Sequence, residues 1–262
     1  MDSAENITDI RNESNWEITT KRYVAYIDIM GFKDMVARKS HEDMYMMMKE
    51  INHKALSNTK IEWLGLKQNL LKKTNYSDSI IIYSKDNSYD SLCSIIFSIS
   101  ALTNDLFTHN IPFKGSLAYG TMTLDDLSSI FFGQPLIDAY LLQDELLMYG
   151  VIVHATAEQE IERHRIEKKS FSFVNNYLCP LKNGNSTHYT IYPIFTAYYK
   201  FEETTKEIVD RCNELSLSIK KLRFHTSGHL RKYIDNTEKY LTDVREKTSK
   251  DDINTNDSYF FT

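Results

Sequence analysis

Blocks of apolar residues alternate with polar stretches and divide the chain into strand-like and helix-like segments. Residues 21–30 are apolar on both faces over "YVAYIDIM", which is typical of a central strand in a sheet. Residues 88–110 keep apolar side chains at helical spacing and form the clearest predicted helix. The remaining segments are predicted as a helix over 40–55, a hairpin over 70–83, a strand over 112–123, a helix over 133–149 that stops at Gly150, a strand over 151–155, a helix over 158–168, two strands within 177–195, and helices over 202–222 and 229–247.

The order of these segments predicts an α+β fold. Strand, helix, two strands, helix and strand in succession match the split plan of a ferredoxin-like antiparallel sheet with helices packed on one face. We expect a flexible N-terminal arm over residues 1–19, a main domain over 20–200, a C-terminal helical extension over 201–248 and a polar tail over 249–262.

Composition narrows the function classes. The net charge of −5 argues against general nucleic-acid binding, which requires clustered basic charge. The sequence has no apolar run near the length of a membrane span and no secretory signal pattern, so we expect a soluble cytoplasmic protein. Its three cysteines are widely spaced and form neither a zinc pattern nor a disulfide framework.

Two aspartates carry the candidate chemistry. Asp28 ends the apolar strand, and Asp78 lies at the turn of the predicted hairpin. A ferredoxin-like sheet places this hairpin beside the first strand, so both carboxylates can converge at one edge. With the backbone carbonyl of Ile29 they offer hard oxygen ligands for Mg²⁺ or Mn²⁺, and Gly31 allows backbone N–H groups to approach phosphates. The alternative is that Asp28 caps a helix and Asp78 is an ordinary turn residue.

Short motifs in a fixed order resemble those of class III nucleotide cyclases. "DIMGF" at 28–32 resembles the first-strand signature of that family, and "SDSIII" at 77–82 lies where the family carries its second metal-binding aspartate. With "FKGSLAYG" at 113–120, "FFGQPLIDAYLLQDE" at 131–145 and "CPLKNG" at 179–184, the chain is most similar to the pyrimidine nucleotide cyclases of bacterial Pycsar anti-phage systems.

This resemblance implies a reaction and its cofactors. The family converts a nucleoside triphosphate, here UTP or CTP, into the 3′,5′-cyclic monophosphate and pyrophosphate. By resemblance, two divalent cations, Mn²⁺ or Mg²⁺, are held by Asp28, Asp78 and the Ile29 carbonyl. One cation activates the attacking hydroxyl and the other stabilises the leaving pyrophosphate. A head-to-tail homodimer is implied, and the cyclic product would activate a downstream effector in antiviral defence.

Further residues are assigned to substrate contacts. The triphosphate is expected to lie across Met30, Gly31 and Phe32, with Lys182 beside the Asn–Gly loop as another contact. Lys114 stands where the family usually has arginine, which keeps the positive charge but loses the bidentate fork. It is either a catalytic cation or a strand residue that faces solvent.

The chain also departs from the family. Purine cyclases carry asparagine and arginine in the helix after the "FG" block, at positions that correspond here to Ile137 and Leu141. We expect the base to be read from Lys72, Thr74 or Tyr76, in the strand before Asp78. The main alternative is a catalytically silent nucleotide-binding or interaction module with the same fold. A diguanylate cyclase is a weaker alternative, because the hairpin reads "YSDSI" and not "GGDEF".

Overall fold

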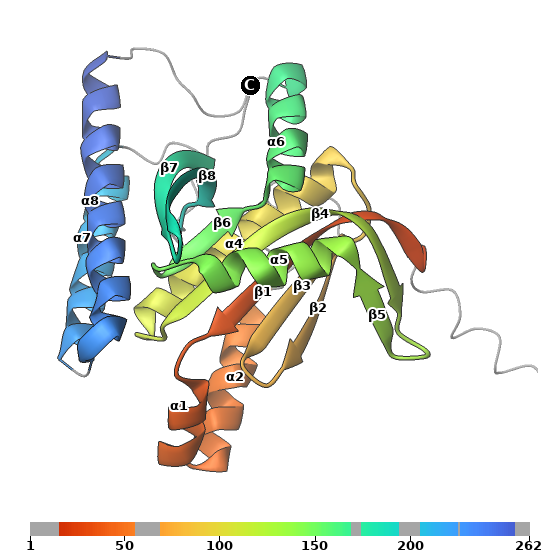
Figure 1. Ribbon diagram of the computed structural model, residues 1–262, viewed down its shortest axis with the longest axis horizontal. Helices are drawn as coiled ribbons and strands as arrows, with labels where there is room; N and C mark the ends of the chain where they lie inside the picture. The colour runs from red at the N-terminus through yellow and green to blue at the C-terminus, as the bar shows by residue number, and fades with distance from the viewer. Residues whose placement is uncertain (1–15, 56–68, 169–173, 194–204, 225, 255–262) are drawn as a thin grey trace, which may run out of the picture.

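The computed structural model describes residues 16–55, 69–168, 174–193, 205–224 and 226–254, and its fold is α+β (Figure 1). Its strands form one sheet in the order β2-β3-β1-β4-β6-β8-β7, with β5 paired to β4. The strands are β1 (Thr19–Ile29), β2 (Leu71–Tyr76), β3 (Ser79–Ser84), β4 (Phe113–Asp125), β5 (Ile130–Gly133), β6 (Gly150–Val153), β7 (Val174–Leu181) and β8 (Gly184–Ile191). The helices are α1 (Phe32–Arg38), α2 (His41–Ala55), α4 (Tyr89–Thr108), α5 (Gln134–Glu145), α6 (Ala155–Lys168), α7 (Thr205–Arg223) and α8 (Arg231–Asn254), with the short 3₁₀ helix η2 (Gly228–Leu230) before α8.

The first four strands confirm the predicted split plan. β1 lies between β3 and β4 and is antiparallel to both, while β2 is antiparallel to β3. The long apolar run of β1 is therefore explained by its central place in the sheet. The sheet then continues beyond the predicted plan, because β6 pairs in parallel with β4 and the β7–β8 hairpin extends the edge.

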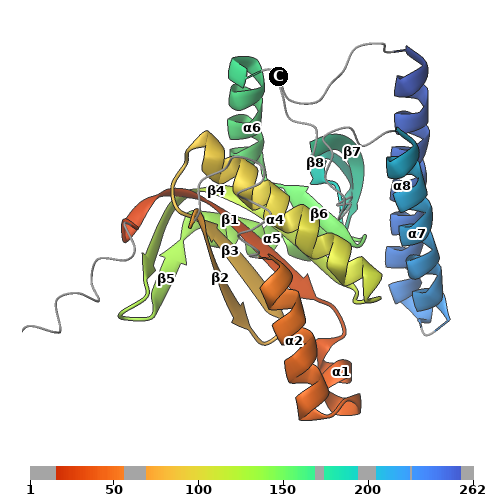
Figure 2. The same cartoon turned by 180° about the vertical axis from the view of Figure 1, so that it is seen from behind.

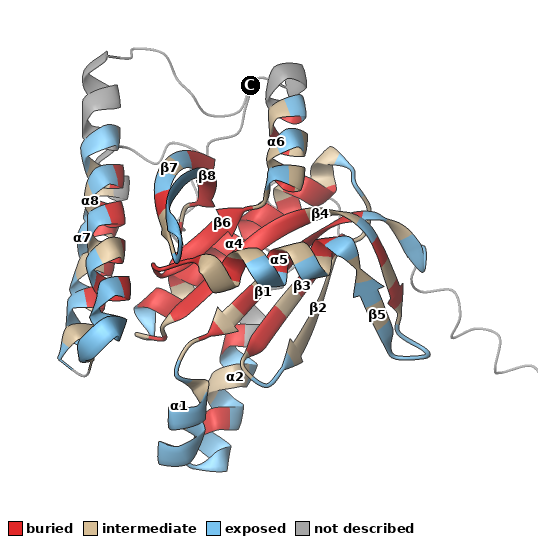
Figure 3. Ribbon diagram, viewed as in Figure 1, coloured by how far each residue is buried: buried red, intermediate tan, exposed pale blue. Residues whose placement is uncertain are grey.

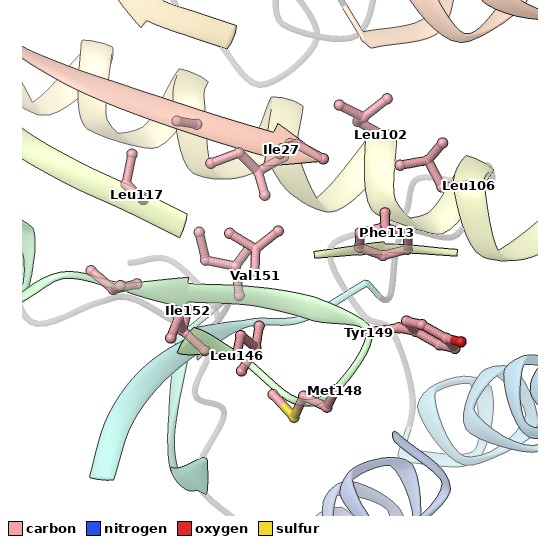
Figure 4. Packing of buried hydrophobic residues seen from close by; sticks show 14 of the residues in the cluster. Ile27, Leu102, Leu106, Phe113, Leu117, Leu146, Met148, Tyr149, Val151 and Ile152 are labelled. Atoms are coloured by element: carbon pink, nitrogen blue, oxygen red, sulfur yellow. The ribbon is translucent and has the colours of Figure 1, made fainter. Parts of the chain in front are cut away.

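Helices cover both faces of the sheet, whereas the sequence predicted helices on one face only. α4 carries an almost continuous set of buried residues and packs with α2 on the face that Ile27 and Leu117 enter (Figures 2 and 4). α5 crosses the opposite face, where Tyr140 meets the ring of Tyr26 at a centroid distance of 5.3 Å (Figure 1). Because side chains alternate along a strand, Tyr26 and Asp28 share the face of α5.

The predicted helix over residues 133–149 is too long. α5 ends at Glu145, and Leu146 adopts an extended backbone and pairs with Leu181. All four residues from 146 to 149 are buried or nearly buried. A helix on the surface of the protein buries only one face, so it could not bury four consecutive residues. Gly150 consequently does not stop a helix but begins β6, opposite Lys114. The short elements α1 and β5 were not predicted.

The C-terminal helices α7 and α8 pack against each other and close one side of the core (Figure 3). Thr237 of α8 accepts a hydrogen bond from the backbone N–H of Tyr149, and Tyr240 donates one to Thr190 of β8. α8 runs to Asn254, past the predicted start of the polar tail at residue 249. The rest of that tail, and residues 1–15 of the predicted arm, lie outside the described residues.

α4 has the length and composition of a membrane span, although the sequence predicted none. It is 20 residues long, and 83% of its most apolar window is buried inside the protein. Its N-terminus is capped by Ser88, whose side chain accepts a hydrogen bond from the backbone of Ser91. The burial identifies α4 as the central core helix of the sheet.

Candidate active site

The site is built on one row of side chains that crosses four strands. Asp28 of β1 pairs with Ser79 of β3 on one side and with Lys114 of β4 on the other, and Tyr76 of β2 pairs with Ser79. Directly paired residues of antiparallel strands point to the same face. The sheet register therefore places all four side chains on the face that α5 partly covers.

Asp78 lies next to this row, in the turn between β2 and β3. Its backbone carbonyl accepts a 2.8 Å hydrogen bond from the N–H of Ile29. Because the N–H and C=O of an extended residue point to the same side of a strand, the Ile29 carbonyl also faces the turn. Ser77 supports this turn in the left-handed conformation, with φ of 55°. The backbone thus brings Ile29 to Asp78, directly after Asp28 in the chain, and a joint metal site of these three residues stays a prediction.

Asp28 is in an unfavourable environment for a carboxylate. Burial is the largest cause that raises its pKa, the negative charge of Asp78 raises it further, and Lys114 partly offsets both. Within the described part of the chain, neither Asp28 nor Asp78 accepts a hydrogen bond or joins an ion pair through its side chain. A half-buried carboxylate with an anionic neighbour and no protein donor is typical of a functional site.

This donor set suits a hard divalent cation. Two carboxylates and a backbone carbonyl are the ligand types that Mg²⁺ and Mn²⁺ prefer. Among the described residues no group of three or more His, Cys, Asp or Glu side chains is arranged to hold a metal ion. Asp28, Ile29 and Asp78 therefore fit as a partial shell, of the kind that Mg²⁺ completes with water and substrate phosphates.

The chain turns sharply after β1 through Gly31. Its φ of 74° lies in the left-handed region, which glycine adopts without steric cost, and α1 follows directly. The side chains of Met30 and Phe32 pack against the main core on either side of this turn. These two side chains therefore take part in core packing, and the backbone N–H of Met30 donates a 2.9 Å hydrogen bond to the carbonyl of Pro112.

The two lysines named from the sequence meet in space. Lys114 is 6% exposed, and its ammonium group lies 3.3 Å from Oδ1 of Asp144 at the end of α5. Lys182 lies 2.6 Å from Oδ2 of the same carboxylate. Lys114 is consequently not a strand residue that faces solvent, which was one of its two interpretations. Asp144 itself was not recognised from the sequence, because only the tertiary structure brings the end of α5 to both lysines.

A second group of residues near the carboxylates was also missed. The hydroxyl of Tyr26 lies 2.5 Å from that of Ser79, and the ring of Tyr26 packs edge-on against Tyr140. Burial raises the pKa of Tyr26, and the charges of Asp28 and Asp78 raise it further. Tyr26 is therefore a neutral hydrogen-bonding group beside the two carboxylates. The period-two alternation with Asp28 is the sequence signal that indicates its position.

The candidate base-reading residues are in different environments. Lys72, Thr74 and Tyr76 alternate along β2 and share the face of Asp28. Lys72 forms an ion pair with Asp126, and its ammonium group lies 4.6 Å from the ring centroid of Trp16. Thr74 forms a side-chain hydrogen bond with Tyr83, whereas Tyr76 is 80% exposed.

The departures from the cyclase pattern lie on the outer face of α5. Ile137 and Leu141 are 50% and 57% exposed, and Tyr140 is 50% exposed. Ile137 and Leu141 offer no hydrogen-bonding group at this surface. Within this chain, no polar side chain takes the two positions that the family gives to asparagine and arginine.

No protein-family model matches the sequence, and the comparison with curated proteins found no relative. Among solved structures, the chain is similar to the catalytic core of a rhodopsin-guanylyl cyclase with converted specificity in complex with ATPαS. That match has 14% identity and a TM-score of 0.45, and it covers 68% of this chain and 98% of the other. Adenylate cyclases from Trypanosoma brucei in their monomeric state match with 10% identity and a TM-score of 0.43, over 71% of this chain and 94% of the other.

A class III adenylyl cyclase-like ATP-binding protein from Pseudomonas aeruginosa also matches, with 10% identity and a TM-score of 0.37, over 90% of this chain and 44% of the other. All three matches are distant similarities of structure.

Proposed function

We propose that this protein is a nucleotide cyclase that converts UTP or CTP into the 3′,5′-cyclic monophosphate and pyrophosphate. The observation that carries the proposal is the pair Asp28 and Asp78 at the end of the central strand. Among the described residues neither carboxylate has a protein donor, the charge of Lys114 acts on Asp28, and Lys182 joins Lys114 at Asp144. Carboxylates next to cationic side chains are what a metal-bound triphosphate requires. The motif order "DIMGF", "SDS" and "FKG" agrees with this assignment.

Each residue then has a physical task. Asp28, Asp78 and the Ile29 carbonyl would hold two divalent ions, Mn²⁺ or Mg²⁺. When bound, these ions supply positive charge that stabilises the attacking 3′-oxygen and the leaving pyrophosphate. The backbone at Gly31 can approach the phosphates closely, because glycine carries no Cβ. Lys114 supplies positive charge to the phosphates from inside the sheet face, where burial strengthens it.

We propose that the active form is a homodimer in which the outer face of α5 and the adjoining β5 meet a second copy. Exposed apolar side chains gather there, in contrast to the buried core. They are Ile130, Phe132, Ile137, Tyr140 and Leu141. An apolar surface of this kind on a small domain favours association. The substitution Leu141→Glu is expected to convert the dimer to a monomer in analytical ultracentrifugation, with loss of product. An unchanged sedimentation coefficient would exclude this face as the interface.

The finer assignments rest on the resemblance to pyrimidine cyclases. They are the choice of UTP or CTP and an antiviral role through an effector that responds to the cyclic product. The cytoplasmic location and the division between a catalytic domain over residues 20–200 and its helical extension are proposed from the composition and pattern of the sequence. The apolar residues Ile137 and Leu141 support an atypical cyclase, because a purine cyclase places polar groups there.

The proposal is tested by product analysis. Purified protein is incubated with ATP, GTP, CTP or UTP and with Mn²⁺ or Mg²⁺, and cyclic monophosphates are detected by mass spectrometry. The variants Asp28→Asn and Asp78→Asn are measured alongside, with their folding checked by circular dichroism. A single cyclic pyrimidine product that is lost in both variants is the expected result. A purine product would refute the pyrimidine assignment alone.

The second candidate is a catalytically silent nucleotide-binding module. The exposed apolar pair Ile137 and Leu141 favours it, because neither side chain can stabilise charge at those positions. Such a module would bind a triphosphate in the presence of Mn²⁺ and release it unchanged. Isothermal titration with a nucleotide, followed by recovery of the intact triphosphate, distinguishes this outcome from turnover.

A further inference from the structure

Two lysines from distant parts of the chain meet at a single carboxylate beside the aspartate pair. Lys114 lies in β4, and Lys182 follows β7, yet both ammonium groups contact Asp144. Each lysine takes a different oxygen, with Nζ to Oδ1 at 3.3 Å for Lys114 and Nζ to Oδ2 at 2.6 Å for Lys182. Asp144 thus bridges two cations in the way that a phosphate group with two oxygens would.

The position of Asp144 in its own helix does not explain this arrangement. Asp144 and Glu145 form the end of α5, whose last turn contains no basic residue. Carboxylates are disfavoured at a helix C-terminus, because the backbone carbonyls there carry partial negative charge. The pKa of Asp144 is nevertheless held low, chiefly by its hydrogen bond with Lys182; burial opposes this shift, and the charge and hydrogen bond of Lys114 add to it. The two lysines, and not the helix, therefore stabilise this charge.

The Asp144 carboxylate is also placed so that it can move away from the two lysines. Its side chain is 50% exposed, and that of Lys182 is 43% exposed. The buried Lys114 has a second acceptor, the backbone carbonyl of Asp144 at 3.2 Å, which stays in place when the carboxylate moves. A movement of the Asp144 side chain into solvent therefore leaves no buried cation without a partner.

Resting on the function proposed above, we propose that Asp144 occupies the phosphate position of Lys114 and Lys182, and that an incoming triphosphate displaces it. Asp144 is then a residue that sets the affinity for substrate, because its carboxylate competes with phosphate oxygens for the same two ammonium groups. It also adds negative charge near Asp28, which opposes the approach of a polyanion. Loss of this carboxylate should consequently strengthen polyphosphate binding, the opposite of what loss of a supporting residue would do.

Isothermal titration with inorganic tripolyphosphate tests the competition without base, ribose or metal. Asp144→Asn is expected to bind tripolyphosphate about tenfold more tightly than the unchanged protein, as one competing charge is removed near the anion. Glu145→Gln is the matched control, because it removes the same charge from the neighbouring position, where the side chain accepts a hydrogen bond from Asn183 and its charge acts on Lys182 less than that of Asp144 does. Its affinity should stay within about twofold of the unchanged protein.

A second comparison separates competition from a general charge effect. In the background Lys182→Met, the gain from Asp144→Asn should shrink severalfold, since one of the two contested ammonium groups is absent. A gain that is the same in both backgrounds, or a gain in Glu145→Gln equal to that in Asp144→Asn, overturns the proposal. Weaker or unchanged binding by a folded Asp144→Asn protein overturns it too, as does failure of both proteins to bind tripolyphosphate.

The outcome is independent of whether the protein is a cyclase. Tighter binding of tripolyphosphate by Asp144→Asn, with no cyclic product from any nucleotide, would uphold the role of Asp144 and reject the proposed reaction. If cyclic product forms, Asp144→Asn should lower KM by the same factor as it lowers the Kd for tripolyphosphate, with a smaller change in kcat.

Discussion

Gly115 is the position where the packing of the sheet and the geometry of the candidate site are most directly coupled. It follows Lys114 in β4 and pairs with Ile27, the residue before Asp28. A Cβ atom at Gly115 would lie 2.8 Å from the backbone oxygen of Tyr26, 2.9 Å from Cγ1 of Ile27 and 3.2 Å from a methyl group of Val151. The first contact is with backbone, so the two strands must move apart by a few tenths of an ångström.

We expect Gly115→Ala to lower the free energy of unfolding by about 1–3 kcal/mol, the usual cost of excess volume in a packed core. For a chain of this size that corresponds to a fall in Tm of about 3–10 °C, measured by circular dichroism or differential scanning fluorimetry. The same movement separates Asp28 from Lys114, so any cyclase activity should fall further than the population of folded protein does.

Gly120→Ala is the control, because it lies on the same strand and its nearest contact is Cδ of Pro135 at 3.2 Å. Contact with the edge of one ring is relieved more easily than contact with the backbone of a neighbouring strand. If Gly115→Ala melts within about 1 °C of Gly120→Ala, the strands yield at low cost and the reasoning is wrong.

Three further outcomes follow from the titratable groups. Asp28→Asn should abolish product and raise the Tm of the metal-free protein, because it removes a half-buried charge beside Asp78. The gain in Tm should be full above the raised pKa of Asp28. It should vanish toward pH 3.8, where the carboxyl of the unfolded chain also binds its proton. With limiting Mn²⁺, product formation should fall on the acid side as Asp28 protonates, at a pH above that of an ordinary aspartate. Saturating Mn²⁺ competes with the proton and should move this fall to lower pH, which two pH–rate profiles measure. His188, whose Nδ1 lies 3.4 Å from Oε1 of Glu158 and 3.2 Å from the carbonyl of Val153, has a raised pKa chiefly through Glu158. His188→Gln should therefore cost most stability below pH 6.5 and progressively less as the pH rises through the raised pKa of His188. An equal loss of Tm at pH 6 and at pH 9 would contradict an ionic role of His188.

The sequence by itself determined the local helices and strands and identified the two aspartates as candidate site residues. The apolar run of β1, the hairpin at Ser77–Asp78 and the helical stripe of α4 each follow from short-range periodicity, and all three are in the structure at nearly the predicted bounds. The split order of strands and helices was sufficient to place β1 between its neighbours. Asp28 was recognised because a charge inside an apolar strand has few structural explanations.

Only the tertiary structure decided how the second half of the sheet continues and what surrounds the aspartates. The early end of α5 was not visible, because residues 146–149 are apolar enough to extend a helix. They are instead buried outside the helix, with Leu146 extended and a bend at residues 148–149. The contact of Lys114 and Lys182 with Asp144 joins positions that are 30 and 38 residues apart, and no local pattern encodes such a distance. Periodicity reports which face of an element is buried, whereas a site of converging charges depends on how whole elements cross. The sequence shows only that Lys114 is a charged residue on a strand. The fold determines that this charge is buried and paired.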